Sequence, residues 1–407
     1  MQSLTQRIQL FHNTDYFRYW CSLLVSNLGN WMQTAAMGWL VLQISGSAEA
    51  LGWVMGLRFL PSLLFSLPAG VLADRCSRRQ IVWLTQSTMM ILAFVTAVLV
   101  ASNTLSYWHL LLLSFAQGTL VSLDLPARQA LVVELVSKAH YSEAVSLNAF
   151  AFNLSRLVGP SLAGLCIAAW GISWAFFINA FTFIPLVITL FLLPVHPPSP
   201  QPAGSSNRPG IWGGVAYVQQ TPLIRQLFFL LGWVSVFGVN FNTLIPAYAR
   251  LELGLEATGY GFLMSALGMG ALMGSLWQIW SPAARPGRVI KAGLALAGFH
   301  LLLGLPLSLS GVAAVWLGCG FAMVTLMINT NTSLQTLAPD DLRGRIMALY
   351  AMVLLGTAPL GAWLSGYLFD HAGGRSAAAL MGLLTLVGLL PSLKVGLPKE
   401  VFLEEAV

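Results

Sequence analysis

The sequence is poor in charged residues. Of its 407 residues, only 8% are Asp, Glu, Lys or Arg, whereas 57% are apolar. Soluble globular domains carry about 25% charged residues, because their surfaces face water. A chain with so little charge cannot cover a water-facing surface of this size. The composition excludes an ordinary soluble domain and predicts that lipid surrounds the protein.

Residues that mark common catalytic and metal sites are scarce as well. The cysteines stand singly, without a CxxC pair or a metal-ligand spacing: Cys21, Cys76, Cys166 and Cys319. The chain has no phosphate-binding loop of the Gly-x4-Gly-Lys-Ser/Thr type, no HExxH and no GxSxG. We therefore expect no metal, no cofactor, no ATP hydrolysis and no enzyme activity. Glycines 268, 270 and 274 lie in an apolar run, where they predict close helix packing.

Long apolar runs are what the sequence does contain. A transmembrane helix needs about 20 predominantly apolar residues. Runs of this kind cover residues 17–43, 48–72, 80–101, 107–127, 143–169, 172–194, 222–249, 256–280, 289–308, 311–337, 345–369 and 375–396. The sequence therefore predicts an all-α membrane protein with twelve transmembrane helices.

The basic residues predict the orientation of these helices. Positively charged residues gather in cytoplasmic segments, and 16 of the 20 Lys and Arg residues fall on the side that holds both termini. The other side holds only Arg250 and Arg375, while Arg58 and Arg156 lie inside spans. Both termini are expected in the cytoplasm. The net charge of +6 thus follows from topology, and no nucleic-acid partner is expected.

One segment divides the chain. Residues 194–214 are rich in proline, glycine and serine and too polar to span a membrane. We predict an N-terminal six-helix half at residues 1–196, a cytoplasmic linker at 197–214 and a C-terminal six-helix half at 215–407. A shift of 199 residues places Gly159-Pro160 on Ala358-Pro359, which fits parallel halves.

The loop after the second span carries a motif. It reads Gly70-Val-Leu-Ala-Asp74-Arg75-Cys-Ser-Arg78-Arg79 and resembles the signature of the major facilitator superfamily, with serine in place of its second glycine. An ordinary positively charged loop would explain the arginines but not Gly70 or Asp74. The resemblance implies the major facilitator fold. It also implies a gating relay in which Asp74 faces helix 11, with the residues Gly70, Asp74, Arg75, Arg78 and Asp124.

The fifth span carries a second motif. Its residues Arg156, Gly159, Pro160 and Gly164 resemble the later part of the antiporter motif of this superfamily, which implies export. Plain small-residue packing is the alternative. Four further segments resemble sequences of the drug:proton antiporter branch, which includes macrolide efflux pumps and enterobactin-type siderophore exporters. They are Ser45–Ser47, Arg58–Pro61, Leu125–Arg128 and Pro339–Arg345.

The sequence departs from that branch where a carboxylate is often found. An acid often follows the glycine of the first helix there, but this chain reads Gly29-Asn30-Trp31. We expect no acid at mid-depth in any span, and Asp124 is expected near the cytoplasmic end. The resemblance implies that the proton is the coupling ion, but no residue is assigned to carry it. A lone helix histidine such as His300 is more often a packing residue.

The resemblance also implies that helices 1, 4, 7 and 10 line a central cavity. Polar and aromatic residues recur there at helical spacing, although such stripes are usually helix packing. With Arg58 added from helix 2, the predicted cavity residues are Asn27, Asn30, Trp31, Thr34, Arg58, Gln117, Trp233, Phe237, Asn240, Phe241, Thr325 and Asn329. Arg58 and Arg156 are deep positive charges without a deep negative one. They favour an anionic ligand, unless they only brace the helices.

These observations predict a multi-pass protein of the plasma membrane. We expect this membrane to be the inner membrane of a bacterium. It would be a secondary active exporter of small amphipathic organic molecules of the siderophore or drug class, with anionic ones favoured. The expected mechanism is proton-coupled alternating access by a monomer within the lipid bilayer. The alternatives are a lipid or lysolipid flippase of the same fold and a non-transporting membrane receptor.

Overall fold

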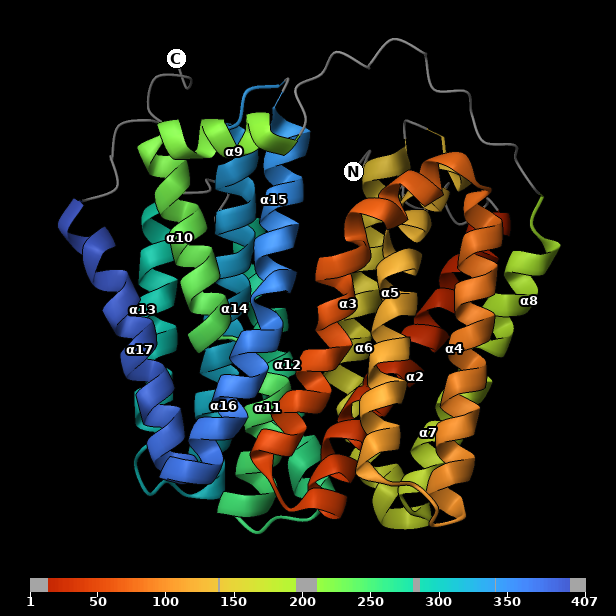
Figure 1. The fold of residues 1–407 in the computed structure, drawn as a ribbon, viewed down its shortest axis with the longest axis horizontal. Coiled ribbons are helices and arrows are strands. Elements are labelled where there is room, and N and C mark those ends of the chain that lie inside the picture. The colour runs from red at the N-terminus through yellow and green to blue at the C-terminus, as the bar shows by residue number, and fades with distance from the viewer. Residues whose placement is uncertain (1–13, 138–139, 195–210, 281–285, 341, 396–407) are drawn as a thin grey trace.

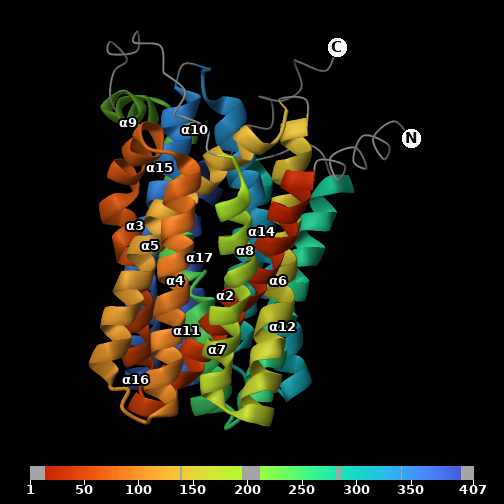
Figure 2. The ribbon, with the colours of Figure 1, turned by 90° about the vertical axis from the view of Figure 1, so that its right-hand side faces the viewer.

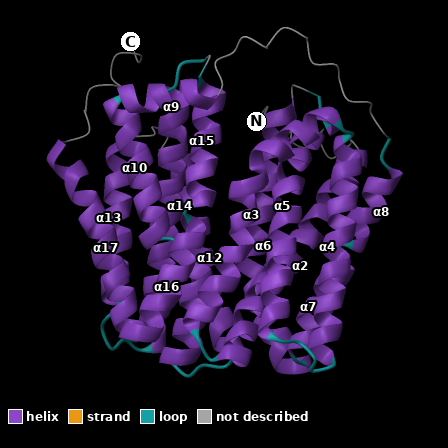
Figure 3. Cartoon of the chain, in the orientation of Figure 1, coloured by secondary structure: helices purple, strands orange, loops and turns teal. Residues whose placement is uncertain are grey.

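The chain is helical wherever its structure is described. The computed structural model describes residues 14–137, 140–194, 211–280, 286–340 and 342–395. Within these ranges the helices are joined by turns and short loops, and no strand occurs (Figure 3). The predicted all-α fold class is confirmed.

Two groups of helices stand side by side (Figure 1). The first helix group consists of α2 (Thr14–Ser45), α3 (Ala48–Arg75), α4 (Arg78–Ala101), α5 (Tyr107–Leu135), α6 (Tyr141–Trp170), α7 (Ile172–Thr182) and α8 (Ile184–Leu192). The second helix group consists of α9 (Ile211–Gln220), α10 (Pro222–Phe237), α11 (Phe241–Ala247), a π-helical turn (Tyr248–Glu252), α12 (Ala257–Trp280), α13 (Pro286–Leu302), α14 (Leu309–Leu337), α15 (Arg343–Gly356), α16 (Ala358–Ala372) and α17 (Gly374–Val395). The predicted division into halves follows the gap in sequence between these groups and stays a prediction.

Some of the predicted spans are built from consecutive shorter helices. Pro185 lies in the first turn of α8 and Pro359 in the first turn of α16. Proline lacks the N–H that would continue the preceding helix, but it fits a first turn. Between α10 and α11, Gly238 ends one helix and Asn240 precedes the next. Each of these spans therefore contains a local break.

In the described ranges, ten segments are long and apolar enough to cross a membrane. Helix α2 runs within the first helix group (Figure 2) and α13 lies beside α17 in the second (Figure 1), but both fall outside this set, and α13 has 17 residues. The multi-pass arrangement is thus confirmed. The count of twelve and the cytoplasmic termini stay predictions.

Large apolar side chains face outward around the bundle. Exposed examples are Trp53, Ile91, Leu112, Leu165, Phe181, Phe191, Phe262 and Leu360. In water a contiguous apolar surface of this kind would drive association, whereas lipid tails accept it. The outer surface therefore agrees with the lipid environment that the composition predicts.

The two groups contact each other mainly at one end, which we call the closed end. It contains the turns of Gly46, Gly171, Gly254 and Gly373, which all have positive φ angles. The opposite end, at which Thr14 begins α2 and Val395 ends α17, we call the terminal end. In Figure 1 the helix groups converge at the closed end and diverge toward the terminal end.

Small residues bring α3 and α16 together at the closed end. A Cβ added at Gly52 would lie 2.6 Å from the carbonyl oxygen of Ala362, and one added at Gly56 would lie 3.3 Å from that of Pro359. A Cβ at Gly366 would overlap the carbonyl of Ala48. The backbones therefore meet without intervening side chains, as in small-residue packing of membrane helices.

Helices α6 and α12 form a second contact of the same kind. A Cβ at Gly164 would lie 2.7 Å from the carbonyl oxygen of Ala257, and one at Gly261 would lie 2.9 Å from that of Pro160. Ser161 and Ser265 share a short hydrogen bond between the same helices. Two close helix pairs, α3 with α16 and α6 with α12, thus join the first group to the second at the closed end.

The last residues of the predicted linker are helical. Residues 195–210 lie outside the described ranges, but Ile211 to Gly214 belong to α9. A Cβ at Gly214 would lie 3.1 Å from Cβ of Arg345, so α9 packs on α15. The packing of α9 on α15 stabilises a helix at a place where the glycines by themselves predict a loop.

We expect Gly366→Ala to lower the melting temperature of the purified protein. The added methyl overlaps the carbonyl of Ala48, and overpacking of this kind costs about 1–3 kcal/mol. Gly298 is the matched control, because a Cβ there meets nothing within 4 Å. Thermal unfolding in detergent checks this expectation, and equal melting temperatures for both variants would contradict it.

Candidate substrate and coupling sites

Arg156 lies in the middle of α6 and contacts both helix groups. Its guanidinium lies 6.0 Å from the ring centroid of Trp31 on α2. Its Nη2 lies 3.7 Å from Sδ of Met323 on α14 and donates a weak hydrogen bond to it. In the described ranges, none of the ion pairs involves Arg156. The cation is therefore held by an indole and a thioether, without a carboxylate.

Close packing of α6 fixes the place of this arginine. A Cβ at Gly159 would lie 2.6 Å from Cβ of Trp31, so α2 and α6 are in tight contact. On the α12 side, the Ser265 hydroxyl donates to the carbonyl of Leu157 at 3.1 Å. Helix α6 is thus held between α2 and α12 next to Arg156.

The predicted antiporter-motif residues lie together along these contacts. Gly159 faces α2, while Pro160 and Gly164 face α12. Pro160 does not interrupt α6, which runs on to Trp170. Packing alone accounts for these small residues, so the link between this motif and export stays a prediction.

Arg58 has a different environment from Arg156. A Cβ at Gly118 on α5 would overlap the carbonyl of Arg58, so α3 and α5 pack closely there. The Nη1 atom of Arg58 is buried and has no hydrogen-bond partner in the described part of the chain. An unsatisfied buried guanidinium nitrogen is costly, which makes Arg58 a candidate to bind a ligand or water. The structure does not bring it into contact with Arg156.

Two of the predicted cavity residues on α2, Asn30 and Thr34, are hydrogen-bonded within their own helix. The Asn30 side chain donates to the carbonyl of Ser26 at 3.0 Å, and the Thr34 hydroxyl donates to the carbonyl of Asn30 at 2.8 Å. Asn27 is buried, whereas Asn30, Trp31 and Thr34 keep partial exposure. Of the predicted cavity residues on this helix, Trp31 is the one that meets Arg156.

Two residues predicted to line the cavity from α10 and α11 pack inside the second group instead. The Trp233 indole donates to the carbonyl of Leu384 on α17 at 2.7 Å, and the ring of Phe237 lies 4.8 Å from that of Trp233 at a tilted angle of 44°. Phe241 is 4% exposed and packs against the rings of both His300 and Trp316. Trp233 and Phe241 thus contact neighbouring helices of their own group, and their place in a cavity stays a prediction.

The remaining predicted cavity residues are buried polar groups. Asn240 is 8% exposed and lies against Gly361 of α16. On α14, Asn329 donates to the carbonyl of Thr325 at 2.8 Å and to Gln278 of α12 at 3.2 Å. Gln117 on α5 is also buried. Their place in a cavity stays a prediction.

The predicted gating relay has different pairs in this structure. Arg78 pairs with Glu134 of α5 at 2.7 Å and not with Asp124, which pairs with Arg128. A Cβ added at Gly70 would meet nothing within 4 Å in the described part of the chain, so Gly70 makes no close helix contact there. Gly70 lies toward the terminal end of α3, where the groups diverge. The side chains of Asp74 and Arg75 lie outside the described residues.

Asp124 is a fully buried acid in α5. Its side chain is 0% exposed and forms an ion pair with Arg128 one turn later. Its Oδ1 accepts hydrogen bonds from Thr85 at 2.8 Å and from Gln86 at 2.9 Å, both on α4. The predicted position of Asp124 near the end of its helix needs correction, because α5 continues to Leu135.

Sequence reasoning missed three partners in these sites. Glu134 pairs with Arg78, Met323 contacts Arg156, and Arg128 pairs with Asp124. The spacing of Asp124 and Arg128, four residues apart, is a usable signal for an ion pair on one helix face. No local pattern links Met323 to Arg156, because they are 167 residues apart.

His300 is a buried packing residue of the second group. It is 0% exposed, and its Nδ1 lies 2.9 Å from the carbonyl oxygen of Leu296. Aromatic rings of Phe241 and Trp316 surround it. These contacts agree with the packing role that its isolated position in the sequence predicts.

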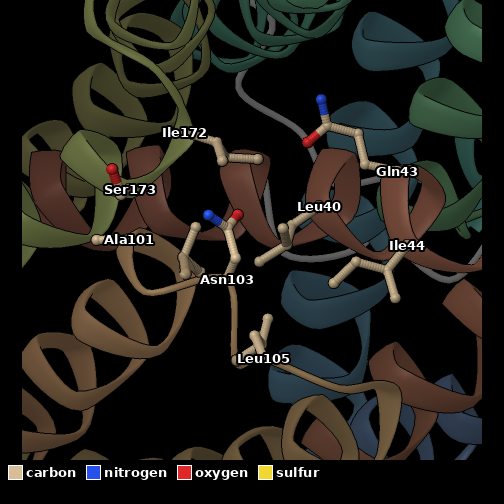
Figure 4. A pocket seen from close by; sticks show the side chains of 9 residues that line it. Leu40, Gln43, Ile44, Ala101, Asn103, Leu105, Ile172 and Ser173 are labelled. Carbon is tan, nitrogen blue, oxygen red and sulfur yellow. The ribbon is translucent and has the colours of Figure 1, made fainter.

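A pocket of about 410 Å³ lies at the closed end of the first group (Figure 4). It is lined by α2, by the end of α4 with the loop after it, and by the start of α7, through residues that include Gln43, Asn103 and Ser173. None of the predicted cavity residues lines it. This pocket is therefore separate from the surroundings of Arg156.

The arrangement of the helices is that of the major facilitator fold. A solved bacterial homologue of the human lysosomal transporter Spinster, inward-facing and unoccupied, matches with a TM-score of 0.76 at 13% identity over 96% of this chain and 99% of its own. The nucleoside transporter NupG matches with a TM-score of 0.77 at 11% identity over 94% and 99%. At such identities the likeness shows the fold.

Sequence comparison then gives the family. Residues 9–405 match the family described as transmembrane secretion effector, and the chain belongs to this family of the major facilitator superfamily. It is a multi-pass inner-membrane protein of a transporter family, and such transporters act on small molecules. The predicted superfamily and localisation are thus confirmed.

Several curated relatives align over most of the chain. The staphyloferrin A transporter of Staphylococcus aureus is 25% identical over 92% of this chain and 94% of its own length. The multidrug efflux pump Tap of Mycolicibacterium fortuitum is 28% identical over 86% and 88%. The enterobactin exporter EntS of Shigella boydii is 29% identical over 79% and 77%. The predicted likeness to siderophore exporters and drug pumps is confirmed.

We expect Asp124→Asn to destabilise the protein strongly. It leaves Arg128 without its partner, and breaking a buried pair costs about 3 kcal/mol or more, with the low value expected because the Arg128 side chain is 22% exposed. Asp340→Asn is the control, since Asp340 is 90% exposed in its pair with Arg343 and surface pairs contribute little. Melting temperatures in detergent compare the two, and similar losses would contradict a buried pair at Asp124.

Proposed function

We propose that this protein exports small amphipathic organic molecules, and that anionic molecules bind best. The observation that carries the proposal is Arg156, a deep cation that contacts Trp31 in one helix group and Met323 in the other. A guanidinium offers several donors to a carboxylate or a catecholate, while an indole and a thioether suit an apolar body. The names of the aligned relatives, two siderophore transporters and a drug pump, support this substrate class.

The same contact supports alternating access by the two helix groups. In this structure the seal lies at the closed end, and Arg156 lies beside the α6–α12 contact. The distribution of basic residues assigns the terminal end to the cytoplasm, so this state opens inward. We propose that the groups rock as units, and that a ligand bound between Trp31, Arg156 and Met323 favours their approach at the terminal end.

We further propose that the proton is the coupling ion and that Asp124 carries it. The residue is fully buried, and its charge is balanced by Arg128 and by hydrogen bonds from Thr85 and Gln86. Protonation removes the charge that holds Arg128, which frees this arginine to change partner. The pair lies within one helix group, so the protein is proposed to act as a monomer.

The substrate proposal is tested by the binding of two ligands to purified variants. We expect Arg156→Gln to weaken the binding of a catecholate siderophore by about 1.5–3 kcal/mol, the range for a charged hydrogen bond. The binding of a cationic dye should stay unchanged. Arg156→Lys should restore part of the affinity, because lysine lacks the planar fork. Arg225→Gln, which removes an exposed arginine of α10, is the control.

Equal losses for both ligands would contradict an anion-selective site. A reduced yield of folded Arg156→Gln with unchanged preference would show that Arg156 only braces α6. Flux of a lysolipid but of neither organic ligand would favour a flippase.

The coupling proposal is tested in proteoliposomes with an imposed pH gradient. We expect Asp124→Asn to lose gradient-driven accumulation but to keep counterflow exchange, which needs no net proton movement. Flux per folded protein is the measurement, and Asp340→Asn should keep both activities. Normal gradient-driven accumulation by Asp124→Asn would contradict proton transfer at this residue.

A further inference from the structure

Asp370 lies in the last turn of α16 and binds the first turn of α3 in the other helix group. Its Oδ1 accepts a hydrogen bond from the backbone N–H of Ala48 at 2.9 Å. Its Oδ2 accepts one from the N–H of Glu49 at 3.0 Å and one from the hydroxyl of Ser47 at 2.6 Å. A single carboxylate thus receives three hydrogen bonds across the closed end.

The start of α3 is built to receive an anion. Gly46 turns the chain after α2 with a φ of +64°, and Ser47 is the N-cap of α3. The Ser47 hydroxyl accepts the N–H of Ala50 at 3.0 Å. The first N–H groups of a helix have no partner within the helix, and its dipole favours negative charge there. Asp370 supplies that charge and satisfies two of these N–H groups.

Neighbouring contacts place Asp370 at this position. Gly366, one turn earlier on α16, lets the carbonyl of Ala48 approach the α16 backbone. The Trp363 indole lies 3.4 Å from Oε1 of Glu49 and donates to it. All of these contacts join the first helix group to the second, so they exist only while α3 and α16 are together.

We propose that Asp370 is the latch of the closed end, a gating residue whose release from α3 accompanies every opening of that end. The proposal rests on the alternating access proposed above. Ser47 alone caps α3 locally, so a cap from the other helix group is not needed for α3 to form. The bonds from Asp370 therefore stabilise one conformation of the transporter relative to the other, and they are replaced by bonds to water when the groups part.

The latch is tested by measuring the separation of the two groups at the closed end. Spin labels are placed at Ser102→Cys and Leu305→Cys, which are exposed residues of the first and second group. The accessible Cys21 and Cys76 are replaced by serine. Double electron–electron resonance in ligand-free liposomes then reports the short and long distances. We expect Asp370→Asn to raise the ratio of the long-distance to the short-distance population by about fivefold. This is the change expected when a carboxylate is removed from a helix N-terminus.

Two further variants separate the latch from general effects of charge or folding. Glu256→Gln removes an exposed acid that also lies at the closed end and should leave the distances unchanged. Ser47→Ala removes one of the three bonds to Asp370 together with the local cap of α3, and it should give a smaller shift in the same direction, which also provides the test if Asp370→Asn does not fold. A folded Asp370→Asn with the wild-type distribution would overturn the proposal. The measurement uses no substrate, so an error in the proposed substrate class does not affect it.

Discussion

The approach of helix backbones at the closed end constrains the rest of the structure. Gly52 and Gly366 remove the side chains that would keep α3 and α16 apart, and Gly164 and Gly261 do the same for α6 and α12. In a membrane the hydrophobic effect does not distinguish a neighbouring helix from lipid, so close packing and polar contacts must hold helices together. These helix pairs meet at the closed end, and the two helix groups diverge toward the terminal end. A polar side chain near the closed end can therefore contact the other helix group.

The depth of charges follows from this arrangement. At the closed end Asp370 is exposed and Glu49 partly exposed, and Asp370 is stabilised by three hydrogen bonds from the start of α3. Asp124 is buried and is stabilised by Arg128 together with polar side chains of α4. Arg156 is different, because its neighbours are an aromatic ring and a sulfur atom. A cation at that depth without an anionic partner is costly, and a ligand that supplies negative charge lowers that cost.

Sequence patterns within one helix predicted which of its residues allow close packing. The small residues of α6 were predicted to permit close helix contact, and Gly159 and Gly164 do so. Gly70 lies where the helix groups diverge, and a Cβ added there would meet nothing within 4 Å in the described part of the chain. Trp233 and Phe241 had helical spacing suited to a cavity, yet periodicity gives only the face of a helix and not the helix that it meets. The indole of Trp233 therefore pairs with α17, a choice that the sequence of α10 does not contain.

The sequence by itself determined the membrane environment, the helical class and the family. These properties depend on composition, on the length of apolar runs and on motifs within one segment, and each acts locally. Only the tertiary structure decided that Arg156 meets Met323, that Arg78 pairs with Glu134, and that Asp370 caps α3. Each of these contacts joins residues far apart in the chain. Their geometry depends on how closely two helix backbones can approach, which is set by packing between helices and not by either sequence segment alone.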